Sequence, residues 1–226
     1  MRRPVAISQH MRRGLPPNFF SGQDLASRRG GRLVFRGLSF SLARGGALLL
    51  AGPNGSGKTS LLRMLAGLTP PEDGQILWRG SPISLDPAAH RARLHFIGHQ
   101  DALKPALTAR ENLAFWAEMR GGTRRGADAA LKSFRLDERA DWPCRYLSAG
   151  EKRRLALARL IASKAWLWLL DEPATGLDAQ ALQNLRAAIS AHRRQGGCIV
   201  AATHAPLILA EAAVLSLADF APRRAA

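Results

Sequence analysis

A glycine-rich stretch at residues 52–59 has the residue types and spacing of a loop that binds phosphate groups. It fits the pattern G-x-x-x-x-G-K-[ST] at every specified position, and its members are Gly52, Pro53, Asn54, Gly55, Ser56, Gly57, Lys58 and Thr59. The glycines let successive backbone N–H groups point into one concavity, where the positive end of a helix dipole also attracts an anion. Lys58 supplies a charge for the β- and γ-phosphates, and the Thr59 hydroxyl is a ligand for Mg²⁺. The stretch therefore predicts binding of a nucleoside triphosphate with Mg²⁺.

The segments on either side of this phosphate loop fit that interpretation. The apolar residues 47–51 come directly before it and predict a buried strand. After it, Leu61, Leu62 and Leu65 have helical spacing, and Gly67 ends the pattern. A strand before the loop and a helix after it distinguish a phosphate loop from a glycine-rich turn that happens to precede a lysine.

Two carboxylates follow the most apolar run of the chain. Residues 166–170 are five apolar residues in succession, typical of a strand buried on both faces, and Asp171 and Glu172 come next. Side chains at the carboxyl ends of parallel strands lie beside such a phosphate loop. We expect Asp171 to hold Mg²⁺ through a water, and Glu172 to orient and polarise the water that attacks the γ-phosphate. The alternative is an acid pair that caps the turn before Pro173.

His204 follows another predicted strand, residues 198–202, through Thr203. If that strand lies beside the strand ending at Asp171, the imidazole reaches the γ-phosphate and holds the attacking water and Glu172 in line. The alternative is that His204 is an ordinary neighbour of the core.

The segment Ser148, Ala149, Gly150 and Glu151 has the spacing of a capping box, which predicts a helix to about Ala162. A well-capped helix is a complete explanation of Ser148 and Glu151. The same helix start also exposes N–H groups to an anion. Because the segment lies far along the chain from the phosphate loop, we infer that it meets a phosphate held by another subunit.

The order of the remaining elements predicts an α/β fold with a parallel sheet. Residues 38–42 alternate as a half-buried antiparallel strand does, residues 75–78 and 94–97 predict further strands, and Thr108 opens a helix through a capping box. A second helix fits residues 127–134, and Asp178 caps a helix to about Arg194. Residues 1–22 carry four arginines, three prolines and no acid, and we expect them to form a disordered basic arm.

Composition limits the classes of partner. The 226 residues carry 33 Lys and Arg against 17 Asp and Glu, a formal charge of +16, which suits nucleotides, nucleic acids or an anionic membrane surface. Two cysteines predict neither a disulfide framework nor a zinc site. Arg159 and Lys164 interrupt the longest apolar candidate, so we expect no membrane-spanning helix and a cytoplasmic location.

The order of these motifs resembles the nucleotide-binding subunits of ABC transporters, from about residue 23 to the end of the chain. The motifs that carry the resemblance are GPNGSGKT, Gln100, LSAGEKRR, LWLLDEP, the stretch from Thr175 to Asp178, and His204. The resemblance implies a P-loop NTPase core with an antiparallel β subdomain and an inserted helical subdomain at about residues 103–160. It also implies a head-to-tail homodimer that holds two ATP molecules between one protomer's phosphate loop and the other's Ser148 region.

The resemblance further implies that Gln100 contacts Mg²⁺ and senses a membrane partner, and that Asp178 communicates across the dimer. Two residues depart from the family pattern, since Ala149 stands where glycine is usual and Glu151 where glutamine is usual. The position at which the family stacks an aromatic ring on adenine falls near Arg29, and a guanidinium also stacks on a base. We therefore expect Arg29 to contact the adenine.

Within this family, several stretches are most similar to the ATP-binding subunits of bacterial cytochrome c maturation systems, often called haem exporters. They are GHQ at 98–100, LK at 103–104, LTA at 107–109 with ENL at 111–113, and LSAG at 147–150 followed by Arg153 and Arg154. That similarity implies a peripheral subunit at the cytoplasmic face of the inner membrane, bound to integral membrane subunits. Its ATP hydrolysis would power haem export or the release of a haem-loaded chaperone. The alternatives are another ABC transporter and an ABC ATPase that acts on nucleic acid. Only 47 residues separate Gln100 from Ser148, which leaves no room for the long coiled-coil arms of the DNA-repair members, so we expect no nucleic-acid partner.

Overall fold

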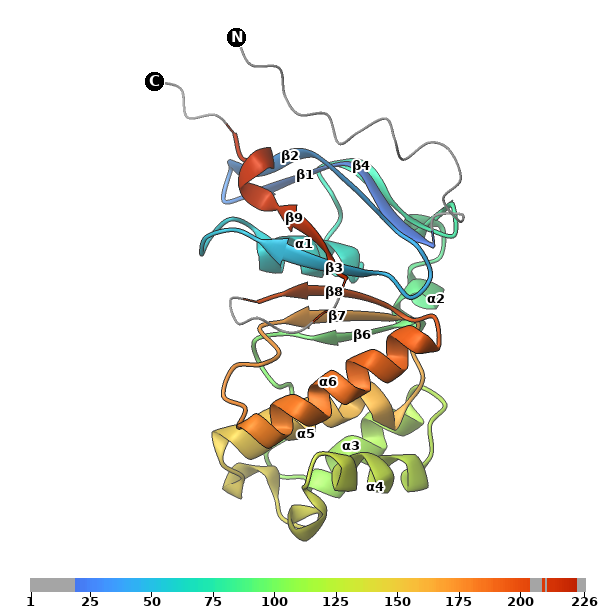
Figure 1. Cartoon of the computed structure of the whole chain (residues 1–226), viewed down its shortest axis with the longest axis vertical. Coiled ribbons are helices and arrows are strands. Elements are labelled where there is room, and N and C mark those ends of the chain that lie inside the picture. The colour runs from blue at the N-terminus through green and yellow to red at the C-terminus, as the bar shows by residue number, and fades with distance from the viewer. Residues whose placement is uncertain (1–18, 204–208, 210, 223–226) are drawn as a thin grey trace.

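The computed structural model of the protein describes residues 19–203, 209 and 211–222. Helix α1 (Lys58–Leu65) lies between an antiparallel sheet on one side and a parallel sheet on the other (Figure 1). The opposite face of the parallel sheet is covered by helices α5 (Ala149–Ala162) and α6 (Ala179–Arg194). The predicted α/β class with a parallel and an antiparallel sheet is confirmed.

The parallel sheet has five strands in the order β6-β7-β8-β3-β9, and every strand pair in it is parallel. Side chains of β7 alternate between two cores: Leu167 and Leu169 pack toward α1, whereas Trp168 packs toward α5 and α6. Burial on both faces explains why β7 and β8 read as unbroken apolar runs. The strand bounds are Ala47–Ala51 (β3), Leu94–Ile97 (β6), Leu167–Asp171 (β7), Cys198–Ala202 (β8) and Ala213–Ser216 (β9).

The antiparallel sheet has the order β2-β1-β4-β5. Its inner face packs on α1, where Phe20 and Phe35 meet Leu61 and Leu65 in one buried cluster. This sheet therefore covers the helix that carries the end of the phosphate loop. Its strands are Phe20–Arg29 (β1), Arg32–Leu42 (β2), Asp73–Trp78 (β4) and Ser81–Pro82 (β5).

The predicted end of the basic arm at residue 22 is wrong, because β1 already begins at Phe20. Phe20 is fully buried, and the ring of Phe19 packs edge-on against Trp78 with centroids 4.6 Å apart. These two phenylalanines bury enough apolar surface to order the backbone, despite the proline and arginine content just before them. Residues 1–18, the rest of the predicted arm, lie outside the described residues.

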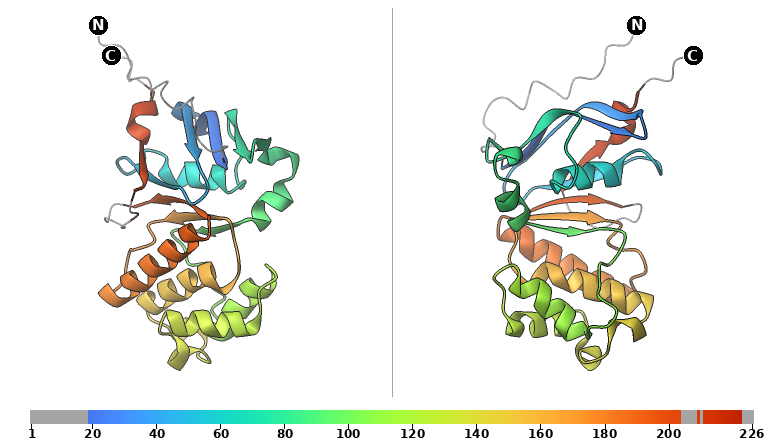
Figure 2. Two further views of the ribbon diagram at one scale, coloured as in Figure 1. Left: turned by 45° about the vertical axis from the view of Figure 1, so that its right-hand side comes forward. Right: turned by 180° about the vertical axis from the view of Figure 1, so that it is seen from behind.

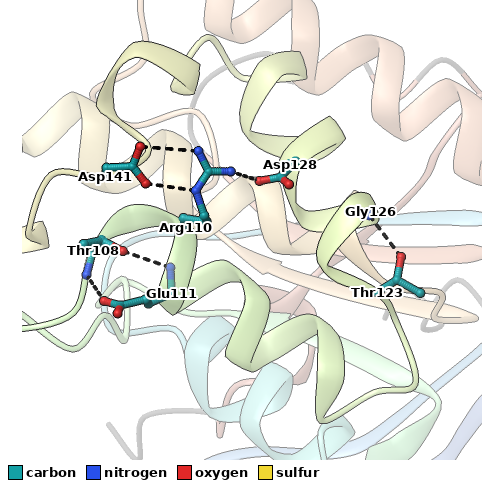
Figure 3. A network of polar contacts seen from close by, with 7 residues as sticks. All are labelled: Thr108, Arg110, Glu111, Thr123, Gly126, Asp128 and Asp141. Atoms are coloured by element: carbon teal, nitrogen blue, oxygen red, sulfur yellow. Dashed lines mark hydrogen bonds and ion pairs between the residues drawn. The ribbon is translucent and has the colours of Figure 1, made fainter.

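Helices α3 (Ala109–Glu118) and α4 (Arg124–Ser133) pack against α5 at the end of the molecule opposite the antiparallel sheet (Figure 2). The predicted capping boxes are both present, at Thr108 before α3 and at Ser148 before α5. Arg110 joins α3 to its surroundings through ion pairs with Asp128 of α4 and with Asp141, the latter at 3.0 Å (Figure 3).

The strands β1, β5 and β9 and the helix α2 (Pro87–Ala92) were not predicted. Short 3-10 helices complete the described chain at Ile83–Leu85, Asp137–Arg139, Cys144–Tyr146 and Leu217–Phe220. Among the described residues, no helix has the length and apolar character needed to cross a membrane.

Candidate nucleotide-binding site

The phosphate loop connects the end of β3 to the start of α1, as predicted. Gly57 caps α1 with φ of 100°, and a Cβ there would lie 2.6 Å from Cγ1 of Val34. Gly52 has φ of 143°, and a Cβ would come within 2.7 Å of the Ser56 hydroxyl. Both positions need glycine, because other residues are strained at such φ values and a side chain would meet its neighbours. The loop is thus a tight cradle held between β2 and α1.

The polar groups of this loop fit a triphosphate. The Lys58 ammonium donates hydrogen bonds to the carbonyls of Gly52 (2.7 Å) and Pro53 (3.1 Å), so its charge lies over the concave side of the loop. The Ser56 hydroxyl is buried and has no hydrogen-bond partner among the described residues. A buried hydroxyl of this kind is costly unless a ligand or water pairs with it. Phosphate oxygens supply the acceptors that such groups need.

Two oxygen ligands suited to Mg²⁺ lie together beside the loop. The Thr59 hydroxyl donates a 2.8 Å hydrogen bond to the Asp171 carboxylate, which is buried at the end of β7. A hydroxyl and a carboxylate are the oxygen donors that Mg²⁺ uses alongside phosphate and water. Residues 59 and 171 come from different elements, so only the fold brings the predicted pair together.

Glu172 begins the turn after β7 with φ of 47°. A left-handed conformation costs a residue with a side chain on the order of 1–3 kcal/mol, and it persists only where the surroundings impose it. The Glu172 N–H donates to the carbonyl of Ala202 at the end of β8, at 2.8 Å. Its side chain lines a cavity of about 230 Å³ together with Lys58, Thr59 and Asp171. The predicted water-activating carboxylate therefore shares a cavity with the phosphate loop.

Arg29 and His99 line the same cavity. Arg29 is the last residue of β1 and is exposed, which is compatible with a contact to a base at the outer edge. His99 had no predicted role, and its only signal in the sequence was its position beside Gln100.

Gln100 lies in the segment after β6, and it lines a second, larger cleft of about 630 Å³. Thr59, His99 and Asp171 line both spaces, so this cleft meets the nucleotide cavity at the proposed Mg²⁺ ligands. Phe96, Trp116 and several arginines also line this cleft. The cleft thus extends from the nucleotide cavity to helix α3.

The Ser148 segment (residues 148–151) is a closed capping box. The Glu151 N–H donates to the Ser148 hydroxyl at 3.2 Å, and the Ser148 N–H donates to the Glu151 carboxylate at 2.8 Å. That backbone bond lowers the pKa of Glu151, with a further contribution from Arg139, whose guanidinium lies 3.3 Å away. The charge of Glu151 is therefore directed to its own helix start and to Arg139.

The described part of the chain keeps the Ser148 segment apart from its own phosphate loop, since none of residues 148–151 lines the cavity beside Lys58. Asp178 is the N-cap of α6, as predicted, and accepts a 2.7 Å hydrogen bond from the Ala181 N–H. His204 lies outside the described residues. The strand before it, β8, does pair with β7, with Ala202 opposite Asp171.

Comparisons with known proteins agree with this geometry. The family model described as ABC transporter matches residues 35–175. The cytochrome c biogenesis ATP-binding export protein CcmA of Rhodospirillum rubrum is 53% identical over 206 residues, covering 91% of this chain and 88% of that protein. The protein of the same name from Paramagnetospirillum magneticum is 51% identical, covering 89% and 95%. A solved ATP-binding subunit of an ABC transporter is similar with a TM-score of 0.76 and 26% identity, covering 82% of this chain and 79% of that chain.

Proposed function

Because the chain belongs to the ABC transporter family, as an ATP-hydrolysing subunit, we propose that it powers a membrane complex for c-type cytochrome biogenesis. The observation that carries this proposal is the 53% identity over 91% of the chain to a cytochrome c biogenesis ATP-binding export protein. In this role, ATP hydrolysis drives haem export or the release of a haem-loaded chaperone.

The arrangement of residues in and around the nucleotide cavity supports their proposed roles in ATP hydrolysis. The phosphate loop binds the triphosphate through its N–H groups and Lys58, while Arg29 contacts the adenine. Thr59, Asp171 and Gln100 would hold Mg²⁺, whose charge would stabilise the transferring phosphoryl group. Glu172 orients the attacking water and accepts its proton at the carboxylate. His204, which follows β8 by two residues in the sequence, holds that water and Glu172 in line, and β8 itself pairs with β7.

We further propose a head-to-tail homodimer in which the Ser148 segment meets the nucleotide of the other protomer. The separation of this segment from its own phosphate loop supports that arrangement. Ser148, Ala149, Gly150 and Glu151 form the start of α5, where backbone N–H groups attract an anion. Asp178 then communicates between the two sites.

The cleft that contains Gln100 is the proposed docking site for an integral membrane subunit at the cytoplasmic face of the inner membrane. It is lined by Phe96 and by Trp116 of α3, whose neighbour Phe115 is 39% exposed and whose C-cap residue Met119 is 64% exposed. Exposed apolar side chains gathered beside a cleft are typical of protein contacts. In this proposal the arginines that line the cleft meet the membrane complex rather than nucleic acid.

Deletion of the gene in the native host tests the cytochrome role. We expect loss of holo-cytochrome c, measured by the peroxidase activity of covalently bound haem, and recovery with the wild-type chain. The Glu172→Gln variant should be produced but fail to restore it, whereas Arg124→Gln, a surface control on α4, should restore it. Normal holo-cytochrome c in the deletion strain would contradict the cytochrome role and leave the ATPase assignment intact.

A further inference from the structure

Arg153 is a buried arginine near the start of α5, and only 6% of it is exposed. One terminal nitrogen donates to the Gly98 carbonyl at 3.0 Å and to the Asp101 carboxylate at 3.1 Å. The other donates to the carbonyls of Asp171 at 3.0 Å and Glu172 at 2.7 Å. Four acceptors from two separate segments therefore meet on one guanidinium.

The two segments are the two parts of the site that must act together. Gly98 and Asp101 flank His99 and Gln100 on both sides, so the bonds of Arg153 brace the short segment that carries Gln100. The other two acceptors are the backbone carbonyls of Asp171, the proposed Mg²⁺ ligand, and of Glu172, the proposed water-activating residue. Strands β6 and β7 are neighbours, with Ile97 opposite Leu170, and Arg153 joins their carboxyl ends just beyond that last pair.

The hydrogen bond from Arg153 to the Glu172 carbonyl helps to hold the backbone of Glu172. Glu172 has a left-handed conformation that a residue with a side chain leaves unless it is held. Its N–H donates to the carbonyl of Ala202 in β8, and its carbonyl accepts from Arg153 of α5 at 2.7 Å and, less closely, from the Thr175 N–H at 3.3 Å. Without the guanidinium, the shortest of these hydrogen bonds is lost, and we expect the direction of the Glu172 side chain to change.

Only arginine has the geometry for this task. Its planar group presents five N–H donors in a fixed fork, and it stays charged when buried. Lysine has a single compact ammonium that rotates freely, so it cannot reach both strand ends with the same rigidity. The single carboxylate, Asp101, compensates the buried charge at one end of the fork.

We propose that Arg153 is a positioning residue for hydrolysis, which holds Glu172 and the Gln100 segment in one fixed relation. Because the same guanidinium binds Asp101 in the wall next to the proposed docking cleft, a shift of that segment is transmitted to Glu172. The positioning role needs only ATP hydrolysis, whereas transmission from a membrane partner rests on the proposed function.

The test is the hydrolysis rate of the full-length protein in two backgrounds. We expect Arg153→Gln to lower kcat by about 10- to 100-fold while the KM for ATP changes less than about threefold. In the Glu172→Gln background the same substitution should lower the residual rate by less than about threefold, because the group that Arg153 positions is already disabled. Arg124→Gln removes an exposed arginine and should leave kcat unchanged in both backgrounds.

Two milder variants keep the proposal testable if Arg153→Gln does not fold. Arg153→Lys should restore part of the lost rate, and Asp101→Asn should lower kcat by about two- to fivefold without an effect on nucleotide affinity. A combination of Asp101→Asn with Arg153→Lys should lower kcat by less than the product of the two single effects. Three results would overturn the positioning role. One is that Arg153→Gln lowers kcat by the same factor in the wild-type and Glu172→Gln backgrounds. The others are a loss of nucleotide affinity with unchanged kcat, and effects of the substitutions at 101 and 153 on kcat that simply multiply.

Discussion

At the scale of single residues, the phosphate loop depends on a cation whose position the fold determines. Lys58 is 9% exposed, and its ammonium lies against two carbonyls of the loop that it follows. In this place the charge faces the concave side, where the β- and γ-phosphates would bind. A buried or half-buried cation interacts with phosphate more strongly than one in bulk water, because less solvent screens it.

Replacement of Lys58 by alanine should therefore remove most of the affinity for ATP. We expect the dissociation constant to rise by at least about 100-fold, since a charge-assisted contact to phosphate is lost without a substitute. Direct calorimetric titration of the full-length protein measures this, with Arg124→Gln as the charge-matched control. Unchanged binding would contradict the proposed cradle.

The Glu172→Gln variant separates binding from hydrolysis. Glutamine has nearly the same shape as glutamate, so the backbone contacts to Ala202 and Arg153 remain possible. It cannot accept a proton from the attacking water, and we expect kcat to fall by at least about 100-fold while ATP affinity stays within about threefold. Phosphate release and nucleotide titration measure the two quantities. Hydrolysis near the wild-type rate would remove Glu172 from its proposed role.

At the scale of elements, capping boxes at Thr108 and Ser148 offer a matched pair. Each hydroxyl accepts a hydrogen bond from the N–H three residues later, at 3.1 Å and 3.2 Å. Thr108→Ala and Ser148→Ala should each lower the free energy of unfolding by about 1 kcal/mol, measured by urea denaturation. Only Ser148→Ala should also lower ATP hydrolysis, because only α5 is proposed to meet the partner's nucleotide. An equal effect of both variants on hydrolysis would argue against that contact.

The elements also show which parts of the fold can be predicted from sequence. The phosphate loop, both capping boxes and β7 are encoded by neighbouring residues, so local spacing was sufficient to find them. Strand β1 was missed as a whole, and the order at its start comes from the packing of Phe19 on Trp78, far along the chain. Similarly, Arg153 shows no local signal, since its four acceptors lie 18 to 55 residues away in sequence.

At the scale of the whole molecule, three buried histidine side chains make the stability of the folded protein sensitive to acid. Burial lowers the pKa of His90, and it lowers the pKa of His95 to about 3 and that of His192 to about 4. His192 stacks on Trp168 with ring centroids 4.0 Å apart, and His95 makes a 3.1 Å hydrogen bond to the Ser163 carbonyl. Burial therefore keeps the rings of His95 and His192 neutral in the folded protein.

The sign of the pH effect follows from these lowered pKa values. Above pH about 6.5 the imidazoles are neutral in both states and the folded protein has its full stability. As the pH falls toward 4, the unfolded chain binds protons that buried His95 and His192 cannot bind, so the free energy of unfolding decreases. At pH 5 each of these two residues should account for a loss of about 2 kcal/mol.

Urea denaturation at pH 7.5 and pH 5 measures this loss directly. A variant with both His95→Gln and His192→Gln should be less stable at pH 7.5, because glutamine packs poorly against Trp168, but its stability should change much less between the two pH values. The wild type and the variant share the carboxylates that also titrate in acid. The difference between their changes in unfolding free energy from pH 7.5 to pH 5 is therefore due to the two imidazoles. If the wild type and the variant lost the same unfolding free energy between pH 7.5 and pH 5, burial of neutral His95 and His192 would not contribute to the acid sensitivity.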